Sequence, residues 1–335
     1  MVVTINHLPL DIITNICLDV KQPHNTARIN KLFNEGTKQS FIHLKNDYKS
    51  KGLITRETGT DKEIVQQVAS HILNMARELS IIIPENNICP EHLLRLKKEI
   101  HDINLIRFYS KLWIIQPQFE GNNNKKAEDI RKWMYENKNV LNQITVLDLK
   151  KSGLTEIPPE ISLLNDLQIL NLQNNNITDI SPLANLTALN KIRLNNNHIV
   201  DVSPLANLTK LNTLCLSDNH IIDISPLANL TKLNKLWLYN NQIVNISPLA
   251  NLTALNTLCL NSNQIVDISP LVNLTKLNKL WLHDNQIVDI SPLANLTKLN
   301  TLCLNNNQIV DISPLVNLTK LNTLSLKNNP IVATP

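Results

Sequence analysis

Cysteine and tryptophan alternate at a fixed spacing in the second half of the chain. Cys215, Cys259 and Cys303 lie 44 residues apart, and Trp237 and Trp281 fall midway between them. Thiols at regular intervals could form a disulfide, ligate a metal ion, or pack as small side chains between the indole rings. Which of these is possible depends on the elements that carry the residues.

A repeated phrase of 22 residues carries this column. Every copy has apolar residues at its first, fourth and sixth places, and the copies from Leu167 to Leu299 also have Asn at the ninth place and Ser-Pro-Leu at the fifteenth to seventeenth. Such a period is typical of a solenoid in which each copy is one coil. A divergent copy of 23 residues begins at Ile144, and the others begin at Leu167, Leu189, Leu211, Leu233, Leu255, Leu277, Leu299 and Leu321.

The copy at residues 211–232 shows how one coil should fold. Leu214 and Leu216 are two residues apart, which predicts one face of a short strand. Ser225 and Pro226 predict the N-cap and first residue of a single helical or 3₁₀ turn on the return leg. One copy cannot bury its apolar side chains alone, so neighbouring copies must stack and share strand hydrogen bonds.

The distance between stacked coils determines whether the Cys residues can form a disulfide or share a metal ion. Adjacent strands lie ~4.8 Å apart, so two successive Cys are ~10 Å apart. That distance exceeds disulfide reach and prevents three Cys from sharing one zinc ion. With no other cluster at ligand spacing, we expect no metal site, no cofactor and no catalytic residue.

Two interpretations of the column remain open. The outward side chains either pack only against their neighbours on adjacent strands, or form an apolar groove that binds a protein. We favour the groove, because an exposed Trp pair is costly without a partner. The residues expected to contact the partner are Arg193, Lys235, Trp237, Tyr239, Lys279, Trp281, His283 and Asp284.

Asparagine occupies the ninth place of every copy but the first, which has Ser152. These Asn could be surface turn residues, since Asn tolerates a left-handed φ. We favour a buried ladder, because one amide can both donate to and accept from the backbones of adjacent coils. Its members are Asn175, Asn197, Asn219, Asn241, Asn263, Asn285, Asn307 and Asn329.

The phrase resembles a leucine-rich repeat, in the 22-residue subclass found in bacterial internalins and in a regulatory subunit of protein phosphatase 1. The resemblance covers Ile144 to the end of the chain. It implies an α/β solenoid shaped as a horseshoe, with a parallel β-sheet on the concave face and short 3₁₀ or helical turns on the convex face. It also implies that a protein target binds the concave face.

Composition gives little sign of other partners. Lys and Arg number 32 against 28 Asp and Glu, a balance too even to indicate nucleic acid, and aromatic residues make up only 4%. There is no signal peptide and no apolar run of about 18 residues, so we expect no membrane association. The five Cys suggest no disulfide framework, and we expect a cytoplasmic location.

Residues 1–143 predict an all-α N-terminal domain. Apolar residues at helical steps predict helices over 8–18 and 27–33, from the capping box at Thr60 to about Leu79, and from Pro90 to about Ile106. Residues 121–126 predict a loop. A last short helix, with Ile130, Trp133 and Met134, is expected to cap the first coil.

About the first 45 residues resemble an F-box. Leu8 and Pro9 match its opening, Asp11 stands where Glu is usual, and Ile12 and Ile16 fit its apolar stripe. An ordinary pair of amphipathic helices is the alternative. Joined to leucine-rich repeats, an F-box resembles the substrate receptor of an SCF-type ubiquitin ligase. This implies binding of a Skp-family adaptor through these five residues and no catalysis by the chain itself.

We therefore predict three segments: F-box-like helices at 1–50, a helical linker and cap at 51–143, and nine leucine-rich repeats at 144–335. Residues 211–254 and 255–298 agree at 35 of 44 positions. Such near-copies resemble the repeats of receptors that intracellular bacteria or large viruses deliver into host cells. The alternative function is a plain scaffold or adhesion solenoid, whose N-terminal helices only cap the stack.

Overall fold

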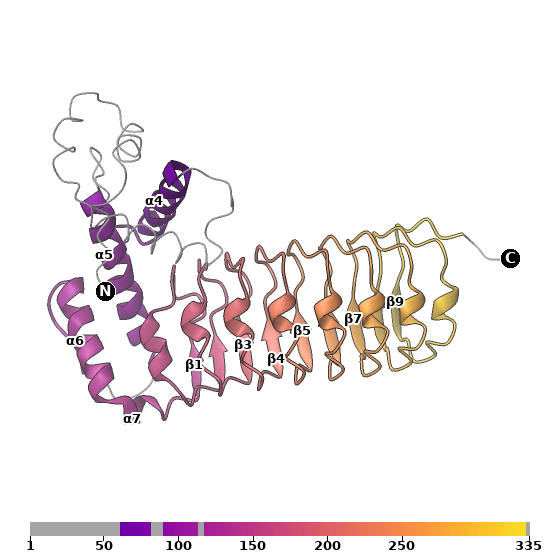
Figure 1. Cartoon of the computed structure of the whole chain (residues 1–335). Coiled ribbons are helices and arrows are strands. Elements are labelled where there is room, and N and C mark those ends of the chain that lie inside the picture. Colours follow the sequence, from indigo (N-terminus) through magenta and orange to yellow (C-terminus); the bar gives the residue numbers. More distant parts are fainter. Residues whose placement is uncertain (1–60, 82–89, 113–116, 333–335) are drawn as a thin grey trace. The chain divides into compact units, whose positions relative to one another are not determined.

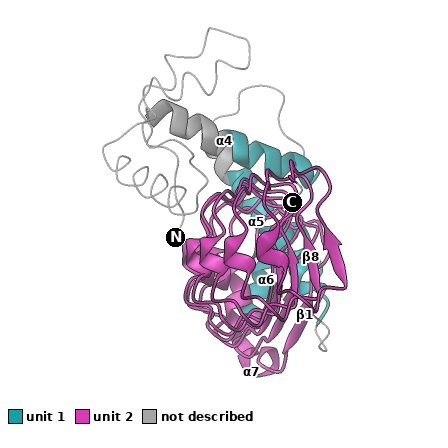
Figure 2. Ribbon diagram, turned by 90° about the vertical axis from the view of Figure 1, so that its right-hand side faces the viewer, with its two compact units in different colours: residues 1–110, 117–132 teal, residues 111–116, 133–335 magenta. Residues whose placement is uncertain are grey.

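The computed structural model describes residues 61–81, 90–112 and 117–332 (Figure 1). The chain divides into two compact units (Figure 2). One takes in the chain up to residue 110 and residues 117–132, and the other takes in residues 111–116 and 133–335. The predicted boundaries at residues 50 and 143 stay predictions.

The first unit contains α4 (Asp61–Glu78), α5 (Pro90–Tyr109) and most of α6 (Asn123–Glu136). Helices α4 and α5 pack together, with Ile72 of α4 and Ile100 and Phe108 of α5 among the buried residues. Arg131 of α6 forms a 2.8 Å ion pair with the buried Asp102 of α5. The predicted helices over 8–18 and 27–33 lie outside the described residues.

The loop predicted at residues 121–126 is shorter than expected. Helix α6 already begins at Asn123. Gly121 takes a φ of +107°, which glycine adopts easily, and the Asn122 side chain accepts a 3.0 Å hydrogen bond from the backbone N–H of Lys125. This capping bond lets the polar Asn-Lys run form the first turn of a helix.

The second unit is built on one sheet. Within the described residues this sheet has nine parallel strands in chain order, as the repeats predict. Each residue pairs with its equivalent in the next copy, for example Cys215 with Trp237. The strands are β1 (Val146–Asp148), β2 (Ile169–Asn171), β3 (Lys191–Arg193), β4 (Thr213–Cys215), β5 (Lys235–Trp237), β6 (Thr257–Cys259), β7 (Lys279–Trp281), β8 (Thr301–Cys303) and β9 (Thr323–Ser325).

Short 3₁₀ helices form the opposite side of the stack (Figure 1), which confirms the predicted solenoid. The core lies between the two sides, where the seven apolar places of an inner coil are fully buried. In the coil at 211–232 they are Leu211, Leu214, Leu216, Ile221, Ile224, Leu227 and Leu230. The 3₁₀ helices are η1 (Pro159–Leu163), η2 (Ser181–Leu183), η3 (Ser203–Leu205), η4 (Ser225–Leu227), η5 (Ser247–Leu249), η6 (Ser269–Leu271), η7 (Ser291–Leu293) and η8 (Ser313–Leu315).

The residue that caps each 3₁₀ turn differs from the prediction. Ser225 is the first residue of η4 rather than its N-cap, so Pro226 is the second. The acceptor is the carboxylate of Asp223. It accepts hydrogen bonds from the backbone N–H and from the hydroxyl of Ser225, each with a donor–acceptor distance of 2.8 Å. The prediction was one residue off because Ser and Asp are both good caps, and the longer Asp side chain reaches forward by two residues.

The two ends of the stack differ. In the first coil Leu147 and Leu149 are fully buried, whereas Leu324 in β9 is 45% exposed. The end of α6 and the short helix α7 (Lys138–Leu141) belong to the same unit as the first coil, and Leu141 is fully buried. No helix within the described ranges is long and apolar enough to cross a lipid bilayer.

Candidate functional site

The outward side chains at the third, fifth and seventh places of each coil form one surface, which we call the sheet face. It corresponds to the face expected to bind a partner. Successive residues of a strand point to opposite sides, so these places alternate with the buried Leu at the fourth and sixth. Because the strands pair in register, residues 22 apart in the sequence become neighbours.

The Cys–Trp column of the sheet face is closed at β6. Strand pairing places Cys259 between Trp237 and Trp281. Cys259 is only 6% exposed and Thr257, beside it, 7%, while the two Trp are half-buried. The sequence led us to expect an exposed Trp pair, but both Trp side chains are partly buried.

The Cys of this column have no sign of reactivity. Burial raises the pKa of the Cys259 thiol to about 12, and it also raises the pKa of Cys215. Both thiols therefore stay protonated near neutral pH, and a protonated thiol is a poor nucleophile and metal ligand. In the part of the chain that the structure describes, no group of three His, Cys, Asp or Glu could hold a metal ion.

The column is open at β4. A hollow of about 560 Å³ lies there, with Thr213 and Cys215 of β4 as its floor. Lys191 and Arg193 of β3 stand on one side, and β5 stands on the other. The remaining lining residues are Lys235, Trp237, Tyr239, Gln173 and Asn195. Four residues of the predicted site, Arg193, Lys235, Trp237 and Tyr239, therefore line one hollow.

The other four predicted residues lie farther along the stack. Lys279 and Trp281 are in β7, and His283 and Asp284 follow directly after it. His283 Nε2 lies 3.8 Å from the Asp284 carboxylate, so the two form an ion pair when the imidazole is protonated. The structure thus divides the predicted site into a polar hollow at β4 and a Trp-bearing strand at β7.

Apart from Asp148 of β1, the acidic residues nearest to the sheet face lie at its rim. Asp218, at the eighth place, accepts a 2.8 Å hydrogen bond from Asn240 of the next coil. Burial raises the pKa of Tyr239, and the negative charge of Asp218 raises it further. The eighth place carries a left-handed φ in all nine coils, which turns the chain away from the sheet.

Two histidines lie beyond this turn. His198 and His220 are exposed, and their rings stack with centroids 5.7 Å apart. Neither lines the hollow at β4. They therefore stand on the flank of the stack and not with His283.

The ninth-place Asn side chains from Asn175 to Asn307 are buried between coils, and Asn329 of the last coil is partly buried. Asn241 Nδ2 donates to the carbonyls of Leu216 and Leu238 at 3.1 and 3.0 Å, and Oδ1 accepts the backbone N–H of Ile221 at 3.0 Å. Equivalent bonds recur from Asn197 to Asn329. Left-handed φ belongs to the residue before each of these Asn, so the turn role and the ladder role fall on neighbouring places.

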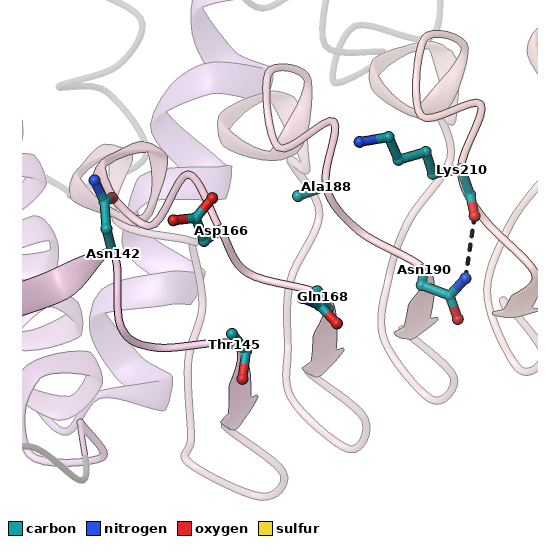
Figure 3. Close-up of a pocket in the computed structure, with 7 residues that line it drawn as sticks. All are labelled: Asn142, Thr145, Asp166, Gln168, Ala188, Asn190 and Lys210. Atoms are coloured by element: carbon teal, nitrogen blue, oxygen red, sulfur yellow. Dashed lines mark hydrogen bonds between the residues drawn. The ribbon is translucent and has the colours of Figure 1, made fainter.

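A second Asn column was not anticipated from the sequence. Asn190 Nδ2 donates to the carbonyl of Lys210 at 3.3 Å (Figure 3), and four later coils repeat the bond from their second place. The recurrence of Asn at this place was the available signal. The column borders a polar hollow of about 570 Å³, lined by Asn142, Thr145, Asp166, Gln168, Ala188, Asn190 and Lys210.

In-register strands, single 3₁₀ turns and an Asn ladder define a repeat solenoid with one long sheet face. The family model described as "Leucine Rich repeats (2 copies)" matches residues 165–207, 209–251, 253–295 and 297–334. The chain belongs to the leucine-rich repeat family.

Solved structures agree with this assignment. Internalin C2 from Listeria monocytogenes is 38% identical with a TM-score of 0.56, and the match covers 68% of this chain and 92% of internalin C2. A leucine-rich repeat protein from Leptospira interrogans is 29% identical with a TM-score of 0.53, over 56% of this chain and 50% of that one. No match was found among curated protein sequences.

Proposed function

We propose that the chain is a non-enzymatic receptor that binds a protein target on its sheet face. The observation that carries this proposal is the continuous wall of outward side chains from β3 to β7, which contains an open hollow and two Trp. A rigid sheet presents such side chains without a large loss of entropy on binding. Trp, Tyr and Arg are also the residues that most often dominate binding energy at protein interfaces.

The structure of the column favours binding over catalysis. The thiols at β4 and β6 are protonated near neutral pH. The His283–Asp284 pair has no nucleophile among the residues of its own strand, β7 (Lys279–Trp281). A hollow rimmed by cations and one indole can hold a side chain of another protein, but it offers no arranged acid and base.

The test is proximity labelling in cultured eukaryotic cells, with the chain fused to a labelling enzyme. We expect the wild type to label a defined set of proteins, and the Trp237→Ala/Trp281→Ala variant to lose most of that set. Val244→Ala/Val288→Ala is the matched control, because these residues lie in the same two coils, are about half exposed and stand off the sheet face. Circular dichroism melts verify that both variants fold.

Identical labelling by the Trp variant and the wild type would show that the sheet face is not the binding surface. Loss of labelling by both double variants, with intact melts, would also contradict the proposal, because it would move the contact to the flank of the stack.

The finer form of this proposal is a substrate receptor of an SCF-type ubiquitin ligase in the cytoplasm of a host cell. It is supported by the sequence of Leu8, Pro9, Asp11, Ile12 and Ile16, which lie outside the described residues. We expect the full chain to co-purify with a Skp-family adaptor, and the Leu8→Ala/Pro9→Ala variant not to. Failure of the intact chain to bind the adaptor would leave the scaffold function.

A further inference from the structure

The hollow at β4 exists because one residue interrupts the alternation of the column. From β5 onward, Trp237 and Trp281 flank the small residues of β6, and Cys259 and Thr257 of β6 are buried. At β4 a Trp stands on one side only, and Arg193 of β3 takes the equivalent place on the other. Arg193 is exposed, and Thr213 and Cys215 stay half-exposed beneath it. A guanidinium prefers water to an apolar floor, so it leaves open the space that a second indole would fill.

The open hollow is cationic. Lys191 and Arg193 point from β3 and Lys235 from β5, around a floor whose thiol is neutral. None of these three cations forms an ion pair with any residue that the structure describes. Three unpaired positive charges on a small neutral floor are a site for negative charge.

The repeats are neutral in total, but many of their basic and acidic residues lie on different sides of the stack. Residues 144–335 have twelve basic and twelve acidic residues. Six of the acidic ones, Asp179, Asp201, Asp223, Asp267, Asp289 and Asp311, cap the 3₁₀ turns on the opposite side. On the sheet face stand Lys150, Lys191, Arg193, Lys235, Lys279 and Lys327, against the acidic residue Asp148, with Asp218 beside Tyr239 and Asp284 beside His283 at the rim.

We propose that the sheet face binds an extended acidic peptide segment, and that the hollow at β4 holds one of its carboxylates between Lys191, Arg193 and Lys235. This inference rests on the proposed function and names the chemistry of the partner. The apolar stem of the bound Glu or Asp, or of its neighbour, then lies against Trp237, which forms the wall opposite Arg193.

The spacing of the cations sets the spacing of the acids. Lys191, Lys235 and Lys279 occupy the third place of alternate strands, so they recur every ~10 Å along the stack. A peptide in the extended polyproline II conformation has three residues per turn and rises ~3.1 Å per residue, so every third side chain returns to the same face after ~9 Å. A segment that crosses the strands therefore meets one cation with every third residue.

Nucleic acid fits this surface less well. Duplex DNA carries one charge per ~1.7 Å, whereas the cations here are spaced about six times more widely. The two Trp of the column are also partly covered by their neighbours, which leaves little indole face for stacking bases.

The test is fluorescence anisotropy on the full chain with short labelled peptides. The probe has Glu at every third residue in an Ala/Ser/Tyr background, and the comparison peptide has the same composition with its Glu clustered at one end. We expect the spaced peptide to bind more tightly. We also expect Arg193→Glu to weaken its binding by roughly 10- to 100-fold, the effect of losing a charge-assisted contact. Higher salt should weaken the wild-type complex.

Lys298→Glu is the matched control. It makes the same charge change at an exposed Lys just before β8, outside the three sheet-face places, and should leave binding within about two-fold of wild type. Lys235→Glu is a second variant for the hollow and should behave like Arg193→Glu. Equal binding of the spaced and clustered peptides, an equal loss in Arg193→Glu and Lys298→Glu, or tighter binding of a single-stranded oligonucleotide of equal charge would overturn the proposal.

Failure of this inference can be told apart from failure of the proposed function. If Arg193→Glu labels the same cellular proteins as the wild type while the Trp237→Ala/Trp281→Ala variant does not, the sheet face binds protein but the hollow does not hold an acidic group. If both variants keep the wild-type labelling, both proposals are wrong.

Discussion

Replacing Leu236 with Ala is expected to lower the free energy of unfolding by about 2–5 kcal/mol. Leu236 is the central residue of β5 and is fully buried, with Leu214 and Leu258 paired on either side. Truncation removes its apolar contacts and leaves a cavity. The backbone at this place is held by strand pairs on both sides, so the coil cannot collapse to fill the space.

Urea denaturation followed by circular dichroism measures this effect. Leu324→Ala is the matched control, because Leu324 occupies the same place of the repeat in β9 but is 45% exposed. Leu324→Ala should lower the free energy of unfolding by less than half as much as Leu236→Ala, because part of the Leu324 side chain is already in water. Equal losses would contradict the burial difference between an inner coil and the last strand.

Most of the repeat architecture could be predicted from spacing alone. The 22-residue period predicted the strands, their register and the neighbours of each sheet-face residue, since every copy must stack in the same way. Leu214 and Leu216 were identified as core residues because two-residue spacing defines one side of a strand. Repetition makes such predictions reliable, because one correct coil implies the others.

What the sequence did not predict depends on side-chain size across neighbouring strands. The Trp pair was expected to be exposed, yet Trp237 and Trp281 are half-buried on either side of the buried Cys259. The hollow at β4 arises from the contrast of Arg193 with those Trp, and a contrast between adjacent strands is visible only once the register is known. The capping role of Asp223 was missed for a local reason: two residues of equal capping ability stood close together.

The sequence predicted that the ninth-place Asn hydrogen-bonds the backbones of adjacent coils, and the structure has these bonds. The Asn241→Ala variant tests how much they stabilise the protein. We expect the variant to lose about 1–3 kcal/mol of unfolding free energy. The change leaves four backbone groups without their side-chain partner: the N–H of Ile221 and the carbonyls of Leu216, Leu238 and Tyr239. Two of these groups belong to the preceding coil, so the variant loses hydrogen bonds that join adjacent coils.

Two further variants separate this bonding from packing. Asn241→Asp keeps the shape and the acceptor but replaces the donor with a carboxylate that faces three carbonyl oxygens. It should therefore destabilise the protein at least as much as Asn241→Ala, whereas a packing role would make it nearly neutral. Asn329→Ala, in the last coil, removes bonds that are only partly buried and should cost less than the inner variant. A thermal melt of Asn241→Ala that matches the wild type would mean that water replaces the amide without cost, and the ladder would then not hold the coils together.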